Sequence, residues 1–446
     1  MRRPVLDFSF VSFGTLIEQF ESGGDKNFAI AIERNDGLCE ICETKIFSDE
    51  KATDKNLKYA ERLVKFMLWA FGGYKVTVCG DKKIFEHIAE QYSLSGQRKF
   101  DVETMEKIYC ESFSVEYSEY QNKPKIKRSP KSVGRSSQGC RIGFDAGGSD
   151  RKVSAVIDGE AVFSEEVVWN PKTNSDPDYH YQGILSAFKQ AASKMPRVDA
   201  IGVSSAGVYV NNKTRIASLF LKVPKEDFEK SITDIYIRAA KEIGDVPLTV
   251  ANDGDVTALA GAMSLSQNCV LGIAMGTSEA GGFVDSDGNI TGWLNELAFT
   301  PVDVSDELPQ DEWSGDFGVG CKYFSQDAVI RLAEKQSIPM DKDLTPAQKL
   351  KTVQELLEKN DPKAIDIYST IGTYLGHALA AYYKFYGMEH VLLLGRVMSG
   401  KGGEIIKCEA ELTLSEDYRA ISKDITLYLP DEKVRRVGQS VAAASL

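Results

Sequence analysis

The chain has 446 residues, of which 43% are hydrophobic and 26% are charged, and its formal net charge is −12. This length exceeds what one hydrophobic core usually organises, so two or three domains are expected. The acidic balance argues against nucleic acid as the main partner. No run of about 20 apolar residues or signal-like N-terminal segment is present, which predicts no membrane association. The eight cysteines do not follow a disulfide-framework pattern, so a reduced, cytoplasmic protein is expected.

Residues 1–122 are predicted to form an α/β extension. Two strand patterns, 28–33 and 38–47, flank Asn35-Asp36-Gly37, which is typical of a β-hairpin. Residues 57–71 have the apolar spacing of an amphipathic helix that ends at Gly72-Gly73, and a strand (74–79), a helix (81–92) and a strand (112–117) follow. One interpretation is a degenerate half-domain, a copy of the region after residue 140. A dimerisation or regulatory role and a simple packing extension both stay open.

Residues 123–140 are basic and rich in Pro, Ser and Gly, which is typical of a linker. Two lobes are predicted beyond the linker, over 141–257 and 258–429, with a C-terminal helix at about 430–446 that returns to the first lobe. Strands are expected at 141–168, 199–204, 269–291 and 390–395. Helices are expected at 183–194, 225–243, 254–265, 325–336, 346–359 and 361–386, with a glycine-rich helix start at 399–406. Strands interleaved with helices of this length favour an α/β fold.

Two glycine-rich turns could hold phosphate groups. The first follows a strand and comprises Asp145, Gly147, Gly148 and Ser149. Glycines let backbone N–H groups approach an anion, the hydroxyl adds a donor, and a carboxylate beside such a turn often holds Mg²⁺. Taken alone, this pattern is weak, because Gly-Gly turns in hairpins are common and an ordinary tight turn with nothing bound is the more frequent reading. A second turn, at Gly276-Thr277-Ser278, follows another apolar strand. Together the two turns indicate a nucleotide cleft closed from two sides.

Polar residues end two strands between these turns. One apolar strand runs into Ser205-Ala206-Gly207, and another ends at Asn252-Asp253. Phosphoryl transfer to a hydroxyl group needs a base near that hydroxyl. Asp253 ends a strand before a helix, where its carboxylate can either face a cleft or cap the helix. The spacing alone leaves both roles open.

These segments, in this order, resemble the ROK family of sugar kinases and sugar-responsive repressors over roughly residues 141–446. Asp145–Ser149 resembles the first phosphate motif, 251–253 the catalytic Glu-Asn-Asp motif and 275–282 the second phosphate motif. Residues 293–298 resemble the sugar-binding Gly-Glu-x-Gly-His segment and 318–321 the Gly-Cys-Leu-Glu segment. The late helix at 361–376 and the adenosine-side strand at 390–395 complete the resemblance.

The resemblance implies an α/β, two-lobed actin-like (ribonuclease H-like) ATPase fold with an extra N-terminal α/β domain. It implies an ATP- and Mg²⁺-dependent, glucokinase-like hexose kinase that forms a homodimer. Asp253 would be the catalytic base. The sugar side would comprise Asn252, Glu296, Ser205 and Gly207. The ATP and Mg²⁺ side would comprise Asp145, Gly147, Gly148, Ser149, Gly276, Thr277 and Gly395.

The sequence also departs from the family pattern. On the nucleotide side the departures are Asp150, Glu279, Arg396 and Val397. Carboxylates near a triphosphate are repulsive unless they point away or bind metal, although Arg151 and Lys152 could compensate Asp150. The alternative reading is therefore a sugar-binding or sugar-sensing protein that has lost ATP turnover.

The family's zinc site is expected to be lost. Phe299 stands at or near the usual histidine, and Cys321 is the nearby cysteine. One thiolate cannot form a tetrahedral structural zinc site. Of the four histidines, His180 is expected in a surface loop and His377 in the core.

Overall fold

The structure is a computed structural model that describes residues 1–128, 134–430 and 438–446. Residues 129–133 of the predicted linker and 431–437 of the predicted C-terminal segment lie outside the described residues. The fold is α/β, as predicted, and the chain divides into two compact units. Unit 1 comprises the described residues of 1–129, 273–281 and 293–429, and unit 2 those of 130–272, 282–292 and 430–446. The N-terminal extension therefore belongs to the same compact unit as residues 293–429.

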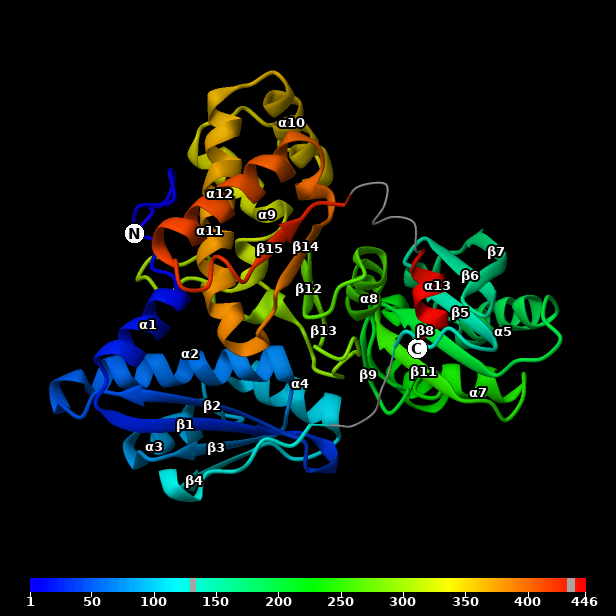
Figure 1. Cartoon of the computed structure of the whole chain (residues 1–446), viewed down its shortest axis with the longest axis horizontal. Helices are drawn as coiled ribbons and strands as arrows, with labels where there is room; N and C mark the ends of the chain where they lie inside the picture. Colours follow the sequence, from blue (N-terminus) through cyan, green and yellow to red (C-terminus); the bar gives the residue numbers. More distant parts are fainter. Residues whose placement is uncertain (129–133, 431–437) are drawn as a thin grey trace. The chain divides into compact units, whose positions relative to one another are not determined.

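Unit 2 is built on a five-stranded sheet of order β11-β8-β5-β6-β7 (Figure 1). Its strands are β5 (Cys140–Ala146), β6 (Asp150–Ile157), β7 (Glu160–Val168), β8 (Ala200–Ser205) and β11 (Leu248–Asn252). β5, β6 and β7 pair antiparallel, whereas β8 lies parallel to β5 and β11 parallel to β8. The carboxyl ends of β5, β8 and β11 therefore meet at one edge of the sheet.

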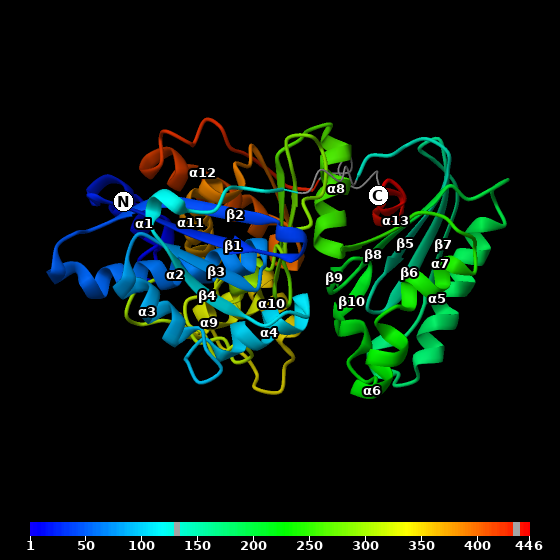
Figure 2. The ribbon, with the colours of Figure 1, turned by 90° about the horizontal axis from the view of Figure 1, so that it is seen from below.

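Helices cover both faces of this sheet (Figure 2). α5 (Pro177–Ala192) and α7 (Ile235–Lys241) pack on the apolar face that contains Ile142 and Phe144. α8 (Asp253–Leu265) and α13 (Gln439–Ala444) pack against each other, and α13 lies on β5 and β8. The small strands β9 (Val208–Val210) and β10 (Lys213–Ile216) form a separate hairpin. The predicted helix over 225–243 is broken into α6 (Lys225–Asp227), a wider turn at Phe228–Ile232 and α7.

Two strand glycines permit the close approach of α13. A Cβ atom on Gly143 would clash with the carbonyl oxygen of Ser440, and one on Gly202 would clash with that of Ala443. Glycine inside a strand often marks a place where another backbone passes close by. The C-terminal helix α13 is therefore an integral part of unit 2 and packs directly on its sheet.

Unit 1 contains a sheet of order β2-β1-β3-β4 formed by the N-terminal extension. Its strands are β1 (Lys26–Glu33), β2 (Cys39–Ile46), β3 (Lys75–Cys79) and β4 (Ser114–Ser118), and its helices are α1 (Phe13–Gly23), α2 (Thr53–Phe71), α3 (Lys82–Gln91) and α4 (Lys99–Tyr109). The hairpin, α2, β3, α3 and β4 match the predicted elements, whereas α1 and α4 were not predicted. β3 runs antiparallel to β1, whereas β8 runs parallel to β5. The strand pairing of the N-terminal extension therefore differs from that of the half-domain of which it was suggested to be a copy.

The second sheet has the order β13-β12-β14-β15. It comprises β12 (Val270–Met275), β13 (Glu279–Val284), β14 (His390–Leu394) and β15 (Thr426–Tyr428), and the chain passes from one unit into the other within β12 and β13. The accompanying helices of unit 1 are α9 (Gln326–Lys335), α10 (Pro346–Glu358), α11 (Pro362–Tyr386) and α12 (Lys401–Asp417). α11 and α12 form the most extensive helix pair, with Gly372 of α11 set against Ile406 of α12.

A buried ion network joins the N-terminal extension to the loop around residue 316. Asp316 is 5% exposed and accepts ion pairs from Arg98 at 2.6 Å, Lys65 at 3.2 Å and Arg62 at 3.3 Å. Lys65 also binds Asp101 at 2.6 Å. Burial alone would raise the pKa of Asp316, but Lys65 and Arg98 lower it. Removing one partner of such a network leaves the other charges buried without a counter-charge, which is strongly destabilising.

Among the residues that the structure describes, no helix is long and apolar enough to cross a membrane.

Candidate functional site

In unit 2, three predicted positions meet at the carboxyl ends of parallel strands. Asp145 of β5 lies in register with Ser204 of β8, and Ser205 lies in register with Asn252 of β11. The Ser204 hydroxyl donates a hydrogen bond of 2.8 Å to Oδ1 of Asp145. Ser204 was not singled out from the sequence. Its position beside Asp145 depends on strand pairing across 59 residues of sequence.

The C-terminal helix connects this edge to Asp253. The side-chain amide Nε2 of Gln439 donates to Ser204 Oγ and to the backbone oxygen of Asp253, each at 3.0 Å. Gln439 is thus a further site residue that sequence reasoning missed. A helix that follows residues outside the described range could not be placed beside Asp253 from sequence pattern alone.

Both carboxyl groups at this edge hold their protons more tightly than usual. Burial raises the pKa of Asp145 to about 6; the Ser204 hydrogen bond opposes this, and the charge of Asp253 adds to it. Burial also raises the pKa of Asp253, against the hydrogen bond from the backbone N–H of Gly254. A carboxylate shifted toward neutral pH is a better proton acceptor than one in water.

The helix-cap alternative for Asp253 is resolved by its neighbour. Asn252 is the N-cap of α8, and its Oδ1 accepts from Gly254 N at 2.7 Å. Its Nδ2 donates to the backbone oxygen of Gly207 at 2.7 Å. Gly207 has φ +140°, and a Cβ there would clash with the oxygen of Ile216. Asn252 therefore ties two strand ends together, and the Asp253 carboxylate does not serve as the cap.

Ser205 is an internal support. Its side chain is fully buried, and its hydroxyl contacts Tyr236 at 2.8 Å and Tyr209 at 2.6 Å. The Ser205 hydroxyl is therefore not exposed for the contact with a sugar that was expected. The residue instead fixes the end of β8 beside Asn252.

The first glycine turn presents free donors. Trp169 takes two of its carbonyl groups, because Trp169 Nε1 donates to Gly147 O at 2.8 Å and Trp169 N to Ser149 O at 3.0 Å. Within the described part of the chain, no acceptor is bonded to the backbone N–H groups of Gly147, Gly148 or Ser149. Successive free N–H groups of this kind form an anion-binding concavity.

The charges around this turn differ in part from those expected. Lys152 lies 3.9 Å from Asp150 and 3.5 Å from Glu166, so it partly offsets the Asp150 charge. Arg151 does not do so, because its guanidinium donates to Ser186 Oγ at 3.1 Å and lies over the ring of Trp169.

In unit 1, the second glycine turn is held by α9, since Gln326 N donates to Gly276 O at 2.8 Å. Thr277 is exposed. Gly395 has φ +97°, and a Cβ there would clash with the backbone of Met275, so the end of β14 requires glycine.

Two departures from the family pattern point into the protein core of unit 1. Glu279 is 3% exposed, and Val397 is fully buried. Burial raises the pKa of Glu279 to about 8, against a weak hydrogen bond from Tyr382. Arg396 is exposed, and its backbone oxygen accepts from Gln354 at 2.8 Å. Glu279 is therefore a buried acid of the core.

The predicted sugar segment rests on the N-terminal extension. The backbone N–H groups of Leu294, Asn295 and Glu296 donate to Phe71, Ala70 and Trp69 at 3.3, 2.9 and 3.0 Å. These carbonyls belong to the last turn of α2, where helix carbonyls otherwise lack partners. The position of Glu296 is thus set by a helix that lies more than 200 residues earlier in the chain.

The region of the family's zinc site is occupied by other contacts. Phe299 packs against Trp69 and Trp313, with ring centroids 4.4 and 5.2 Å away. Cys321 is a buried thiol whose pKa is raised by burial and by Asp311. Among the described residues, no group of three or more His, Cys, Asp or Glu side chains could hold a metal ion.

The two histidines have different outcomes. His377 lies in the core, as predicted, with Nδ1 2.8 Å from the hydroxyl of Tyr418. The prediction that His180 lies in a surface loop was wrong. It is fully buried on α5, with its ring against Trp169 and Phe220. Its chain neighbours are polar, so only tertiary packing reveals the burial.

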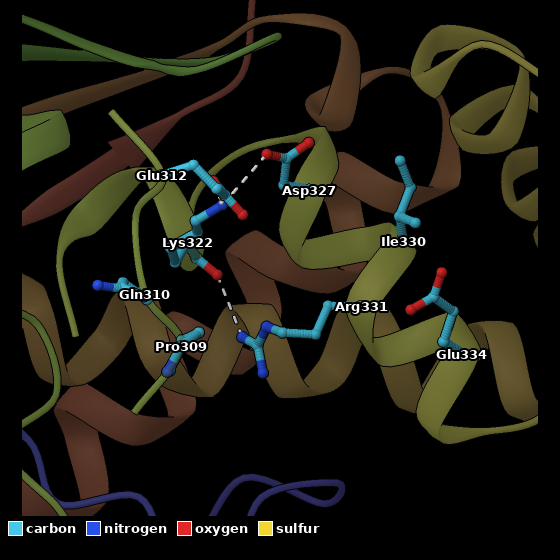
Figure 3. A pocket seen from close by; sticks show the side chains of 8 residues that line it. All are labelled: Pro309, Gln310, Glu312, Lys322, Asp327, Ile330, Arg331 and Glu334. Carbon is cyan, nitrogen blue, oxygen red and sulfur yellow. Dashed lines mark hydrogen bonds and ion pairs between the residues drawn. The ribbon is translucent and has the colours of Figure 1, made fainter. Parts of the chain in front are cut away.

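Unit 1 also contains a polar pocket of about 430 Å³ between the 309–312 loop and α9 (Figure 3). Lys322 Nζ lies 2.5 Å from Glu312 and 3.6 Å from Asp327, and Arg331 donates to the Lys322 backbone oxygen at 3.1 Å. None of the predicted site residues lines the pocket. Because carboxylates of the protein already satisfy its lysine, we assign it no ligand.

The structure is an α/β protein in which each of the two units has a glycine-rich turn that follows a strand. The family model of the ROK family matches residues 141–403, and the chain belongs to that family. None of the curated proteins compared with the chain matches it.

Among solved structures, the chain is similar to a ROK hexokinase from Thermus thermophilus (18% identity, TM-score 0.52, covering 69% of this chain and 96% of that one). It is also similar to a ROK-family transcriptional regulator described as a homologue of the E. coli MLC protein (16%, 0.51, 69% and 78%). A third is a glucokinase from Parabacteroides distasonis (15%, 0.50, 70% and 97%). At these identities the likeness establishes the fold, and it includes both kinases and a regulator.

Proposed function

We propose that the protein is an ATP-dependent sugar kinase that transfers the γ-phosphoryl group of ATP to a hydroxyl of a hexose or hexose derivative. The observation that carries this proposal is the Asp145–Ser204–Gln439–Asp253 arrangement at the carboxyl edge of β5, β8 and β11. It holds two half-buried carboxyl groups, which interact through their charges, at one edge of the sheet and leaves the helix cap to Asn252. If Asp253 served only to cap the helix, it would not need these hydrogen bonds around it.

In the proposed reaction, Asp253 accepts the proton of the attacking sugar hydroxyl. The bond from the sugar oxygen to phosphorus forms as the bond from phosphorus to the β-phosphate oxygen breaks, and ADP leaves. The free N–H groups of Gly147, Gly148 and Ser149 would bind phosphate oxygens, and Gly276, Thr277 and Gly395 are proposed for the nucleotide as well. Donors fixed in advance stabilise charge that develops in the transition state.

The residues present fit Mg²⁺. Asp145 is a half-buried carboxyl group whose ionised form is disfavoured by burial, and its Oδ2 accepts no hydrogen bond from the described residues. Mg²⁺ in nucleotide sites is usually held by one or two carboxylates together with phosphates and water. Asp145 would hold it, and the ion would neutralise charge on the phosphates. No cage of protein ligands is needed for this role.

On the sugar side we propose Asn252 and Glu296 as the polar contacts. Asn252 Nδ2 has a second hydrogen beyond the one donated to Gly207. Glu296 is partly exposed, and its backbone is fixed by α2. Gly207 would contribute to the sugar side through the tightly packed turn that it forms. Ser205 is buried and would act indirectly, by fixing the end of β8.

A second candidate function is a sugar-binding or sugar-sensing protein without ATP turnover. The observation that favours it is Asp150, which stays beside the first glycine turn and is only partly offset by Lys152 at 3.9 Å. Glu279 and Val397, two of the other departures that speak against ATP binding, are buried in the core, and this supports the kinase rather than the sensor.

The test combines binding with turnover. Thermal shift with Mg-ATP and with a panel of hexoses and N-acetylhexosamines separates the two functions, because a ligand stabilises the state that binds it. A kinase should respond to both ligand classes and release ADP only with its sugar. Stabilisation by a sugar, none by Mg-ATP and no ADP release would establish the sensor instead.

The proposed setting is the cytoplasm, which is supported by eight free thiols and no disulfide among the cysteines. A homodimer is proposed from the family alone. Light scattering at several concentrations would test it, and a mass of one chain at all of them would refute it.

A further inference from the structure

Lys172 lies directly over the first glycine turn of unit 2. It belongs to the short 3₁₀ helix Pro171–Thr173, which follows β7. A Cβ atom built on Gly148 would lie 2.8 Å from Lys172 Cε and 3.0 Å from its Nζ. The space that glycine leaves at this position is therefore filled by the end of the lysine side chain. A larger residue at position 148 would displace the ammonium group.

The segment that carries Lys172 is anchored at several points. Trp169, 4% exposed, binds carbonyl oxygens at both ends of the turn. Asn170 N donates to the Tyr179 hydroxyl at 3.0 Å, and Pro171 is buried. His180 Nε2 lies 3.3 Å from Asn174 O, and the ring is buried. The backbone at Lys172 is thus held in register with the turn rather than free to swing away.

The ammonium group is also not neutralised locally. Within the described residues Lys172 forms no ion pair with a carboxylate, in contrast to Lys152, which has two carboxylate neighbours. Its charge lowers the pKa of Asp253 against the larger effect of burial. Lys172 therefore acts electrostatically on both the turn and the proposed base. An unpaired ammonium beside three free N–H groups makes a site for a multiply charged anion.

We propose that Lys172 binds the phosphate groups of the phosphate donor at the first glycine turn, on the side facing Asp253. Lys172, beyond the end of β7, thus adds a positive charge at this turn to that of Lys152, which lies 3.9 Å from Asp150. Lys172 forms and breaks no covalent bond. This inference rests on the proposed kinase function for its role in catalysis, but the phosphate contact itself does not depend on turnover.

The test measures binding by calorimetry, with Mg²⁺ and a non-hydrolysable ATP analogue and separately with inorganic tripolyphosphate. The variants are Lys172→Met, Lys172→Gln and Lys172→Arg. The control is Lys189→Met, an exposed lysine of α5 in the same unit. Losing one charge-assisted contact is expected to weaken binding of both probes about 10- to 100-fold. Lys172→Arg should restore most of the affinity, and Lys189→Met should behave as the wild type.

Sugar affinity and melting temperature should stay unchanged in the Lys172 variants, because the side chain is exposed. The proposal is overturned if Lys172→Met and Lys172→Gln bind both probes as the wild type does. It is also overturned if the wild type binds neither probe, or if sugar affinity falls in parallel. If the wild type binds the probes, the variants lose that binding and no sugar is phosphorylated, the kinase function fails while the phosphate contact stands.

Discussion

Replacing Glu279 by glutamine is expected to stabilise unit 1 at neutral and alkaline pH. Glu279 is 3% exposed, and its Oε2 has no hydrogen-bond partner in the described protein. Its Oε1 accepts only a long hydrogen bond, 3.5 Å, from the Tyr382 hydroxyl. Oε2 also lies so close to Gly320 that a Cβ there would clash with it. A carboxylate in this setting loses its hydration without gaining a cation, so burial raises its pKa to about 8.

The magnitude follows from proton linkage. The folded protein binds this proton more tightly than the unfolded chain does, so stability falls as the pH rises from about 4.5 to about 8. Each pKa unit corresponds to about 1.4 kcal/mol, which sets an upper limit of about 5 kcal/mol above both values. Between about pH 6 and about pH 9, the wild type should lose about 3 kcal/mol relative to Glu279→Gln. That difference corresponds to roughly 5–10 °C in melting temperature.

The assay is thermal unfolding of wild type and Glu279→Gln over this pH range, with Glu307→Gln as the control. Glu307 is an exposed carboxyl group in the same unit, and its replacement should leave the pH dependence unchanged. The curves of wild type and Glu279→Gln should diverge progressively as the pH rises. Parallel curves would show that Glu279 ionises without penalty, and the reasoning would be refuted.

Two further substitutions test how the units are built. Asp316→Asn should destabilise unit 1 by about 3–5 kcal/mol, because Lys65 and its neighbouring arginines keep uncompensated buried charge. Chemical denaturation of this variant and of the exposed control Asp306→Asn measures the difference in the free energy of unfolding. Equal stability of the two variants would contradict the prediction. Gly202→Ala should displace α13 and lower ADP release, because its Cβ would clash with Ala443 O. The control Gly438→Ala, where a Cβ meets nothing within 4 Å, should match the wild type, and a fully active Gly202→Ala would contradict the proposed role of α13.

Local patterns were sufficient for much of the fold. The hairpin of β1 and β2, the end of α2 at Gly72 and the strand–glycine–strand unit at 140–157 all follow from turn residues and periodicity within a short stretch. α1 was missed although its signal is local, since Ser12 caps it and Phe13, Leu16, Ile17 and Phe20 have helical spacing. Reading that spacing would have predicted the helix.

The rest depends on contacts between distant segments. Asp316 and Lys65 are 251 residues apart, and neither environment suggests a buried ion network. Gln439 reaches Ser204 over 235 residues. The backbone of Glu296 is set by the last turn of α2. In each case the partner is a polar group of common type, so no motif marks it, and only the packing of the elements brings the pair together.

The central claim is that a sugar hydroxyl receives phosphate through the site at Asp253. Phosphorus NMR of reactions with Mg-ATP and each sugar of the panel detects the sugar phosphate directly and separates transfer from ATP hydrolysis. The wild type and Asp245→Asn, which changes an exposed aspartate of the same unit, should form the same sugar phosphate. Asp253→Asn should form it about 10²–10⁴-fold more slowly while staying folded, because Asn252 caps α8. A sugar phosphate formed at the wild-type rate by Asp253→Asn, or by no form of the protein with any sugar, would contradict the account.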